Sequence, residues 1–289
     1  GLAPSQIDYL IGGDLLGQMI ATSFGVKEMD IPFFGVYGAC STMGESLSLA
    51  SILIDGGYAD HVMSLTSSHN ASAERQFRFP PAYGNQKPLA ATWTVTGAGA
   101  VVLSSEKISQ KQKKILAESQ VQWEDGYRDV VVTGITTGKI VDYGIKDSMN
   151  MGAVMAPAAC DVIKSNIEDL QIRPNEDGRI ITGDLGKVGK EILLDLLLQH
   201  KIDISDNYMD CGIEIFNNEA QDTHSGGSGC GCSAVMLSAM ILPKLFSGEW
   251  KKVLFLPTGA LLSVVSFHEG KSVPAIAHGI VFESRSEKK

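Results

Sequence analysis

Short apolar runs alternate with helical apolar stripes along most of the chain, and this alternation predicts an α/β fold. The run at residues 31–37, Ile-Pro-Phe-Phe-Gly-Val-Tyr, is typical of a strand. Four apolar residues in the next segment are spaced 4, 3 and 4 positions apart: Met43, Leu47, Ala50 and Ile54. This spacing puts them on one face of a helix, which we expect over residues 41–56. Cys40 therefore lies at a strand-to-helix turn, where Gly38 and Ala39 leave room for the backbone.

The remaining patterns extend this arrangement along the chain. Further strands are expected at residues 7–11, 60–66, 97–103, 129–137, 180–182, 211–216, 253–256 and 277–282. Further helices are expected at residues 151–170, 190–200 and 233–246. Pro243 is predicted to kink the last of these helices. Residues 71–93 predict an irregular excursion, and the lysine-rich segment 105–120 is typical of a solvated linker.

Several elements recur in the same order in the second half of the chain. Gly13-Asp14-Leu15 recurs as Gly183-Asp184-Leu185, and Cys40 recurs 192 positions later as Cys232. The apolar stripe after Cys40 and the two strands that follow it also have counterparts. We therefore predict two duplicated α/β halves related by a pseudo-two-fold axis, in αβαβα layers.

The duplication also suggests where the halves meet. We expect an N-terminal half at residues 1–115, lacking its first strand or helix, and a C-terminal half at residues 116–289. The helices after Cys40 and Cys232 are apolar enough to be buried between two sheets. A pocket is then expected where loops of both halves meet above these helices.

Composition narrows the range of functions. Of 289 residues, 44% are hydrophobic and 20% charged, and the net charge is −9. A surplus of negative charge argues against a general nucleic-acid-binding or anionic-membrane surface. The five cysteines have no zinc-like spacing and are interpreted as reduced thiols. We expect neither a signal peptide nor a transmembrane segment in the chain.

Several motifs resemble one known family. The duplication, the Gly38–Thr42 turn and the Gly97–Leu103 strand together resemble the thiolase fold, whose condensing enzymes carry a nucleophilic cysteine at the position of Cys40. The string Thr66–Arg78, Thr-Ser-Ser-His-Asn-Ala-Ser-Ala-Glu-Arg-Gln-Phe-Arg, and the loop Gly226–Ala234 resemble the stage V sporulation protein AD family.

The resemblance implies a thiolase-like protein without enzyme activity. It implies binding of dipicolinic acid, or its calcium chelate, during uptake into the developing spore. It further implies sporulation membrane proteins of the same operon as partners and a peripheral location at the inner membrane of the spore or forespore. Thiolase-like proteins commonly pair through the first half, which makes a homodimer the expected state.

The residues around Cys40 weigh against catalysis. A thiol at a helix N-terminus has a lowered pKa and suits a nucleophile, but a condensing enzyme also needs a base and an oxyanion partner. The loops at residues 183–186 and 226–230 carry neither histidine nor asparagine, so His278 is the only histidine on a matching loop. The sequence thus favours a binding protein with a degenerate site. Two alternatives stay open: a cysteine-dependent acyltransferase or condensing enzyme that uses Cys40 with His278 as base, and a scaffold for membrane partners.

A planar dicarboxylate needs hydrogen-bond donors and positive charge. Arg75 and Arg78 are candidate carboxylate clamps because a guanidinium pairs with a carboxylate through two hydrogen bonds. Asp14 and Asp184 occupy equivalent turns and are expected to be structural. We predict no metal and no cofactor, and a ligand site formed by Cys40, Thr42, Ser67, Ser68, His69, Arg75, Arg78, Gly229, Cys230 and His278.

Overall fold

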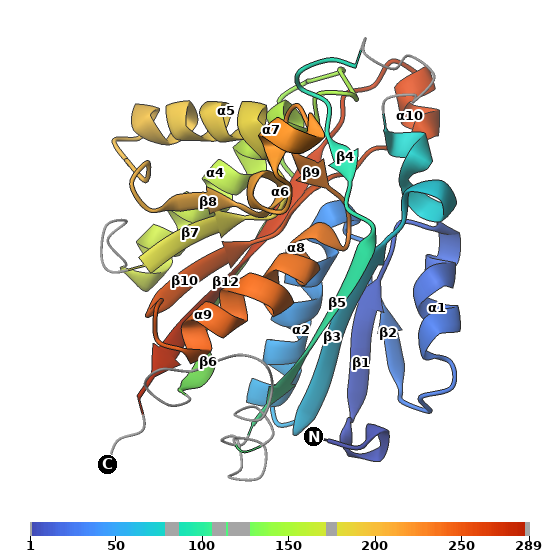
Figure 1. Cartoon of the computed structure of the whole chain (residues 1–289), viewed down its shortest axis with the longest axis vertical. Helices are drawn as coiled ribbons and strands as arrows, with labels where there is room; N and C mark the ends of the chain where they lie inside the picture. The colour runs from blue at the N-terminus through green and yellow to red at the C-terminus, as the bar shows by residue number, and fades with distance from the viewer. Residues whose placement is uncertain (1, 79–86, 106–113, 115–127, 172–177, 287–289) are drawn as a thin grey trace.

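Two mixed β-sheets organise the computed structural model, which describes residues 2–78, 87–105, 114, 128–171 and 178–286 (Figure 1). The first sheet has the strand order β2-β1-β3-β5. Its strands are β1 (Tyr9–Gly13), β2 (Phe33–Gly35), β3 (His61–Ser68) and β5 (Gly97–Ser104). β1 runs parallel to β2 and β3, whereas β5 is antiparallel to β3.

The second sheet repeats this plan. The central path is β8-β7-β10-β12, with β11 and β6 also paired to β12. Its strands are β6 (Asp129–Thr137), β7 (Gly178–Thr182), β8 (Tyr208–Asp210), β10 (Lys252–Leu256), β11 (Thr258–Ala260) and β12 (Ala275–Arg285). β7 runs parallel to β8 and β10, and β12 is antiparallel to β10. Strand order and direction therefore match between the sheets, which confirms the predicted duplication.

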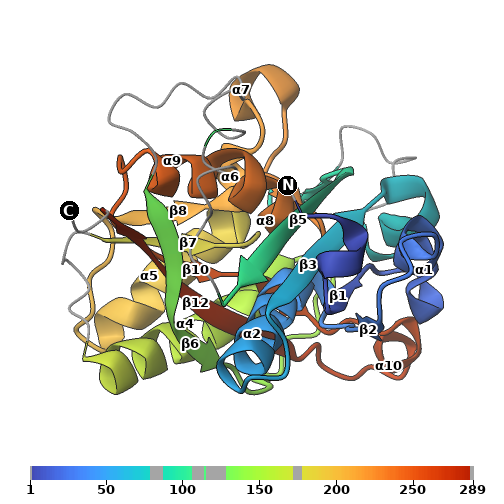
Figure 2. The ribbon, with the colours of Figure 1, turned by 90° about the horizontal axis from the view of Figure 1, so that it is seen from below.

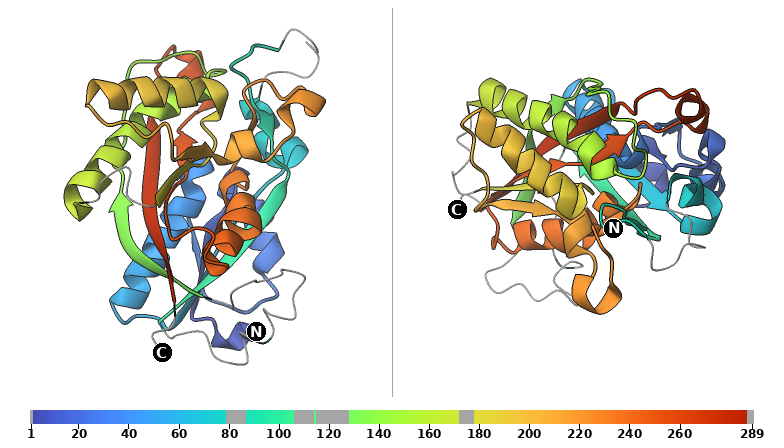
Figure 3. Two further views of the ribbon diagram at one scale, coloured as in Figure 1. Left: turned by 60° about the vertical axis from the view of Figure 1, so that its left-hand side comes forward. Right: turned by 90° about the horizontal axis from the view of Figure 1, so that it is seen from above.

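Helices separate and cover the sheets in the predicted layers (Figures 1 and 3). The helices are α1 (Ile20–Val26), α2 (Thr42–Asp55), α4 (Met151–Leu170), α5 (Gly186–Gln199), α8 (Cys232–Met236) and α9 (Leu242–Phe246). α2 contacts both β3 and β12, and α8 contacts β5 and β3. α4 and α5 pack on the outer side of the second sheet, and α1 lies outside the first. Seen from below, α2 lies between the two sheets (Figure 2).

The central layer holds one of the two largest apolar clusters. Met43 and Leu47 of α2 are fully buried with Leu237 and Ile241 of the helical segment that follows Cys232. Gly99 in β5 allows this approach, because a β-carbon there would lie 2.3 Å from the carbonyl oxygen of Ala234. The small residues at the start of this strand are therefore required by helix packing.

The helical segment that follows Cys232 is continuous from α8 to α9, but its winding changes before Pro243. The turn Leu237–Ile241 between α8 and α9 is a π-helix, and Pro243 lies in the first turn of α9. A proline has no N–H for the i−4 carbonyl, and a π-turn absorbs the missing bond. The sequence predicted a kink at Pro243, and the structure has a π-turn, a common site of helix kinks, directly before α9.

Two predictions need correction and one remains untested. The strand predicted at 211–216 is wrong. The observed strand is β8, which ends at Asp210, and Cys211–Glu214 form helix α6. The carboxylate of Asp210 caps this helix by accepting a hydrogen bond from the N–H of Ile213. The segment after β3 is helical over Asn70–Phe77, not irregular from residue 71, although residues 79–86 lie outside the described part. The predicted boundary between residues 115 and 116 also lies outside it.

The remaining short elements lie near the loops of both halves. They are β4 (Trp93–Thr94), β9 (Gly227–Ser228), α7 (Asn218–Gln221) and α10 (Val264–His268). β4 comes from the first half and β9 from the second, and they pair in parallel. The β4–β9 pair therefore connects the loops of the two halves through backbone hydrogen bonds. Within the described ranges, no helix combines the length and hydropathy needed to cross a bilayer.

Candidate functional site

The turn before α2 places Cys40 inside the protein. Ala39–Ser41 form a single 3-10 turn, and Ala39 has a φ of 53°. Thr42 fixes the turn because its hydroxyl donates to the carbonyl of Ala39 (2.6 Å) and accepts from the N–H of Gly38 (3.1 Å). Only 6% of Cys40 is exposed. A left-handed backbone at a residue with a β-carbon is strained, and such strain is concentrated at functional turns.

The thiol of Cys40 lies among hydroxyl and carboxylate groups. Its sulfur is 3.9 Å from the hydroxyl oxygen of Ser228, which donates to the carboxylate of Asp184. Burial raises the pKa of Cys40 well above its usual value, and the charges of Asp184 and Glu74 raise it further. The effect of the helix N-terminus expected from the sequence is thus outweighed, and the group is a neutral thiol at physiological pH.

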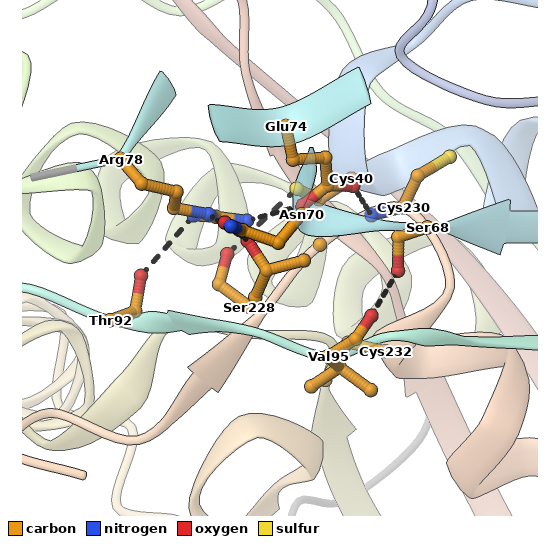
Figure 4. Close-up of polar contacts among 12 residues, drawn as sticks. Cys40, Ser68, Asn70, Glu74, Arg78, Thr92, Val95, Ser228, Cys230 and Cys232 are labelled. Atoms are coloured by element: carbon orange, nitrogen blue, oxygen red, sulfur yellow. Dashed lines mark hydrogen bonds and ion pairs between the residues drawn. The ribbon is translucent and has the colours of Figure 1, made fainter. Parts of the chain in front are cut away.

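A buried ion pair forms one wall of the site (Figure 4). A guanidinium nitrogen of Arg78 lies 2.7 Å from the carboxylate of Glu74, and both side chains are buried. Glu74 also accepts from the N–H of Cys230 at 3.0 Å. Arg78 donates to the hydroxyls of Thr94 (2.9 Å) and Thr92 (3.3 Å). We predicted from the sequence that the guanidinium of Arg78 binds a ligand carboxylate. In the structure its positive charge is already balanced by the carboxylate of Glu74.

Backbone N–H groups of the glycine-rich loop, residues 226–231, donate hydrogen bonds to the side chains around the ion pair. The N–H groups of Gly229, Cys230 and Gly231 donate to Asp184, Glu74 and Ser68 respectively. Ser68 in turn donates to the carbonyl of Val95 (Figure 4). Gly229 has a φ of 136°, which a residue with a β-carbon rarely adopts. These three amides are engaged within the protein, so they are not free donors for a ligand.

The structure gathers some of the predicted ligand residues and separates others. Cys40, Thr42, Ser68, Arg78, Gly229 and Cys230 are buried around the meeting point of the two halves. Cys230 points its sulfur at the carbonyl of Gly13 (3.7 Å). Ser67 is half-buried, whereas Arg75 is exposed. His69 is also exposed, and its ring accepts from the N–H of Ser72.

His278 is buried but engaged elsewhere. Its Nδ1 accepts from the N–H of Gly138 at 3.3 Å, and its backbone packs against Gly44 in the first turns of α2. Burial lowers its pKa. In the described part of the chain no histidine is hydrogen-bonded to Cys40, whose sulfur contacts Ser228.

Sequence reasoning missed two residues of the site. Glu74 received no role, although Glu74 and Arg78 are four positions apart, which is the spacing of a helical ion pair. Ser228 lay unremarked within the glycine-rich loop. Asp184 was expected to tie loop backbone, and it does so through Gly229 and also accepts from the hydroxyl of Thr258.

Comparisons with known proteins place this chain in a family. The profile of stage V sporulation protein AD matches residues 1–283. The chain belongs to the stage V sporulation protein AD family. Stage V sporulation protein AD of Bacillus subtilis (strain 168) is 42% identical over 282 residues, covering 98% of this chain and 77% of that protein. The chain is therefore a sporulation protein, as the sequence motifs indicated.

Solved structures show the same fold at low identity. A tetronic acid condensing enzyme, AbyA1, superposes with a TM-score of 0.60 at 13% identity over 98% of this chain and 80% of its own. The 3-oxoacyl-[acyl-carrier-protein] synthase III of Aquifex aeolicus gives 0.54 at 14% identity, over 98% and 79%. A variant of OleA from Xanthomonas campestris gives 0.56 at 14%, over 96% and 76%. The fold is therefore thiolase-like, and at this identity the likeness shows the fold alone.

Proposed function

We propose that this sporulation protein is a ligand-binding protein that takes up dipicolinic acid or its calcium chelate for delivery into the developing spore. The observation that carries the proposal is the state of Cys40: a buried thiol whose hydrogen-bond neighbour is a hydroxyl and whose charged neighbours favour the protonated form. A neutral thiol beside the Ser228 hydroxyl suits hydrogen bonding to a polar ligand better than attack on an acyl group.

Arg78 supplies the positive charge that a carboxylate needs. One of its nitrogens is paired with Glu74, but within the described ranges the contacts of Nη1 are long, 3.3 Å to Thr92 and 3.6 Å to the sulfur of Met151. A ligand carboxylate in reach of Nη1 replaces weak partners with a charge-assisted hydrogen bond. Arg78 is thus the clamp we assign, and exposed Arg75 is not part of it.

The local charge favours the calcium chelate over the free dianion. Glu74 and Asp184 are two buried carboxylates, and Arg78 is the cation paired with one of them. A dianion added here meets a surplus of negative charge, whereas a chelate of one calcium ion and one dianion is neutral. We therefore expect calcium to strengthen binding.

Isothermal titration calorimetry tests this function. Dipicolinate is titrated with and without equimolar calcium, and pyridine-2,6-dicarboxamide serves as a neutral analogue of the same shape. We expect saturable binding of dipicolinate, tighter binding with calcium and no binding of the dicarboxamide. Absence of heat with millimolar dipicolinate in both conditions would exclude the proposal.

One observation keeps an acyl-transfer function as a second candidate. The strained Ala39 and the 3-10 turn that precedes α2 preserve the form of a nucleophile elbow. In that case Cys40 would carry the acyl group, with His278 as base. Intact-mass analysis after incubation with several acyl-coenzyme A species tests it, because an enzyme of this type gains one acyl mass on Cys40.

We also propose that two copies pair through the first sheet. β2 is an edge strand of that sheet; Phe34 within β2 is 52% exposed, and Tyr37 just after it is 55% exposed. An open strand edge with exposed aromatic rings suits a protein partner. Sedimentation equilibrium should give a dimer for the wild type and a monomer for Phe34→Glu. A monomeric wild type would contradict this pairing.

The membrane location is proposed to depend on partner proteins. The expected partners are sporulation membrane proteins of the same operon, and the expected location is the inner membrane of the spore. In sporulating cells the protein should sediment with that membrane and become soluble when those partners are deleted. Membrane association that survives their deletion would contradict this route.

A further inference from the structure

Lys87 carries an ammonium group that lacks a hydrogen-bond partner. Its Nζ is buried, and among the described residues it finds no acceptor. The nitrogen lies 3.7 Å from the centre of the Trp93 ring. An ammonium has three donors, and an aromatic face compensates only part of their lost hydration. The ammonium group of Lys87 therefore has hydrogen-bond donors that are not satisfied.

The surroundings of Lys87 are built from both halves of the protein. Trp93 belongs to β4, and its N–H donates to the carbonyl of Gly226 at 2.9 Å. The neighbouring Pro88 carbonyl contacts Nδ1 of His224 at 3.1 Å. His224 has a φ of 53°, so the loop that holds this contact is strained. Lys87 and Trp93 are thus supported by the same loop that holds the wall beside Cys40.

The charge of Lys87 is only weakly compensated at this point. Burial and the nearby charge of Arg78 lower the pKa of Lys87 to about 8, and Asp222 opposes this shift. Asp222 is 91% exposed and lies 3.5 Å from Nε2 of His224. Near neutral pH most of the ammonium is charged. The guanidinium of Arg78 is balanced by Glu74, and among the described residues the solvated carboxylate of Asp222 is the counter-charge of Lys87. A bound anion would relieve both the repulsion and the missing acceptor.

The rings available here point to an aromatic acid. Trp93 is 46% exposed, so a planar ligand can reach the ring edge from solvent. We propose that Lys87 and Trp93 form an outer binding position for a small aromatic acid, whose carboxylate accepts a hydrogen bond from the Lys87 ammonium. The identity of that acid as dipicolinate rests on the function proposed above, but the position itself requires only an aromatic ring and one carboxylate. Arg78 of the inner site donates hydrogen bonds to Thr92 and Thr94, which flank Trp93 in β4, and this connects the outer position to the inner site.

Lysine NMR tests the outer position directly. The lysines of the full chain are methylated with carbon-13, and the Lys87 signal is assigned by its loss in Lys87→Met. Benzoate and dipicolinate are titrated separately, with benzamide as the neutral control. We expect both acids to move the Lys87 signal in a saturable way, and benzamide to leave it in place. Lys27, whose Nζ lies 5.3 Å from the centre of the Phe24 ring, is the matched control and should not move.

Isothermal titration calorimetry of variants measures how much Lys87 contributes to dipicolinate affinity. Lys87→Met should weaken dipicolinate binding about tenfold or more, as expected for loss of one charged hydrogen bond, and Lys87→Arg should restore most of the affinity. Lys27→Met should bind as the wild type does. Circular dichroism checks that each variant is folded.

The outcomes separate this inference from the proposed function. An unmoved Lys87 signal, together with calorimetric binding of dipicolinate, would overturn the outer position and leave the proposed function standing. A Lys87 signal that responds to benzoate while calorimetry detects no dipicolinate would support the outer position and reject the proposed function. No response to either acid in either measurement would overturn both.

Discussion

The carboxylate of Glu74 lies 2.7 Å from the guanidinium of Arg78, with 0% of the glutamate side chain and 7% of the arginine side chain exposed. The same carboxylate accepts the N–H of Cys230, which belongs to the other half of the protein. One buried ion pair therefore joins the segment after β3 to the glycine-rich loop. The stability of the site depends on both partners being present.

Removal of one member of the Glu74–Arg78 ion pair should lower the stability of the protein. Arg78→Met leaves Glu74 as an uncompensated buried charge and should lower the free energy of unfolding by about 3–5 kcal/mol. The double variant Glu74→Gln with Arg78→Met should recover part of that loss, because neither member of the pair is then left as an unpaired buried charge. Urea unfolding measures each value. The exposed Arg75→Met is the control and should change stability by about 0.5 kcal/mol or less; a loss at Arg78 no larger than that would contradict the role of the pair.

The thiol of Cys40 should react slowly in the folded protein. All five cysteines are buried, and the pKa of Cys40 is raised, so little thiolate is available. We expect almost no reaction with Ellman's reagent at pH 7 until denaturant is added, when all five thiols react. The alkylation rate of Cys40 should still be rising at pH 9. Rapid modification of Cys40 at pH 7, absent in Cys40→Ser, would show an activated nucleophile.

His278 should make stability depend on pH in a defined direction. Burial lowers its pKa in the folded state, and its Nδ1 accepts a hydrogen bond from Gly138. The unfolded chain, with a histidine pKa of about 6.5, then binds more protons than the folded chain at pH values below it. The contribution of His278 to stability is complete above about pH 6.5 and is lost as the pH falls through the folded pKa.

A conservative variant isolates this effect. His278→Asn keeps an acceptor for Gly138 but does not titrate. The wild type should therefore lose more stability than His278→Asn between pH 7 and pH 5, as measured by urea unfolding at each pH. Parallel pH profiles of the two proteins would contradict the assignment.

Gly229 should tolerate no side chain. A β-carbon there would lie 2.7 Å from an oxygen of Glu74, and the φ of 136° is itself unfavourable for alanine. Gly229→Ala should lower the free energy of unfolding by about 1–3 kcal/mol and weaken ligand binding. Gly25→Ala is the control: no atom lies within 4 Å of its added β-carbon, and alanine favours helix α1. Thermal unfolding that ranks the two variants equally would contradict this account.

Periodic and repeated patterns predicted the fold well. The stripe containing Met43 and Leu47 predicted α2, and helix α4 was predicted within its observed bounds, because helix packing imposes its period on the sequence. The strand predicted at 211–216 failed for a local reason. Asp210 caps a helical turn there, and a short apolar run does not by itself distinguish a strand from a buried turn.

The site was harder to predict because its contacts join distant positions. Glu74 meets Cys230, 156 positions away, and Ser228 meets Cys40, 188 positions away. The sequence located Cys40 at its turn, but the ionisation of its thiol depends on burial and on Asp184, which only the folded chain brings together. Arg75 and Arg78 look equivalent in the sequence, yet one is exposed and the other is paired inside the protein.

A crystal structure of the protein with calcium and dipicolinate tests the central claim most directly. We predict that the ligand lies beside Cys40 with a carboxylate on Nη1 of Arg78, and that no covalent bond joins it to the sulfur. Ligand bound only at a distance from Cys40, or a covalent adduct on its sulfur, would contradict the account.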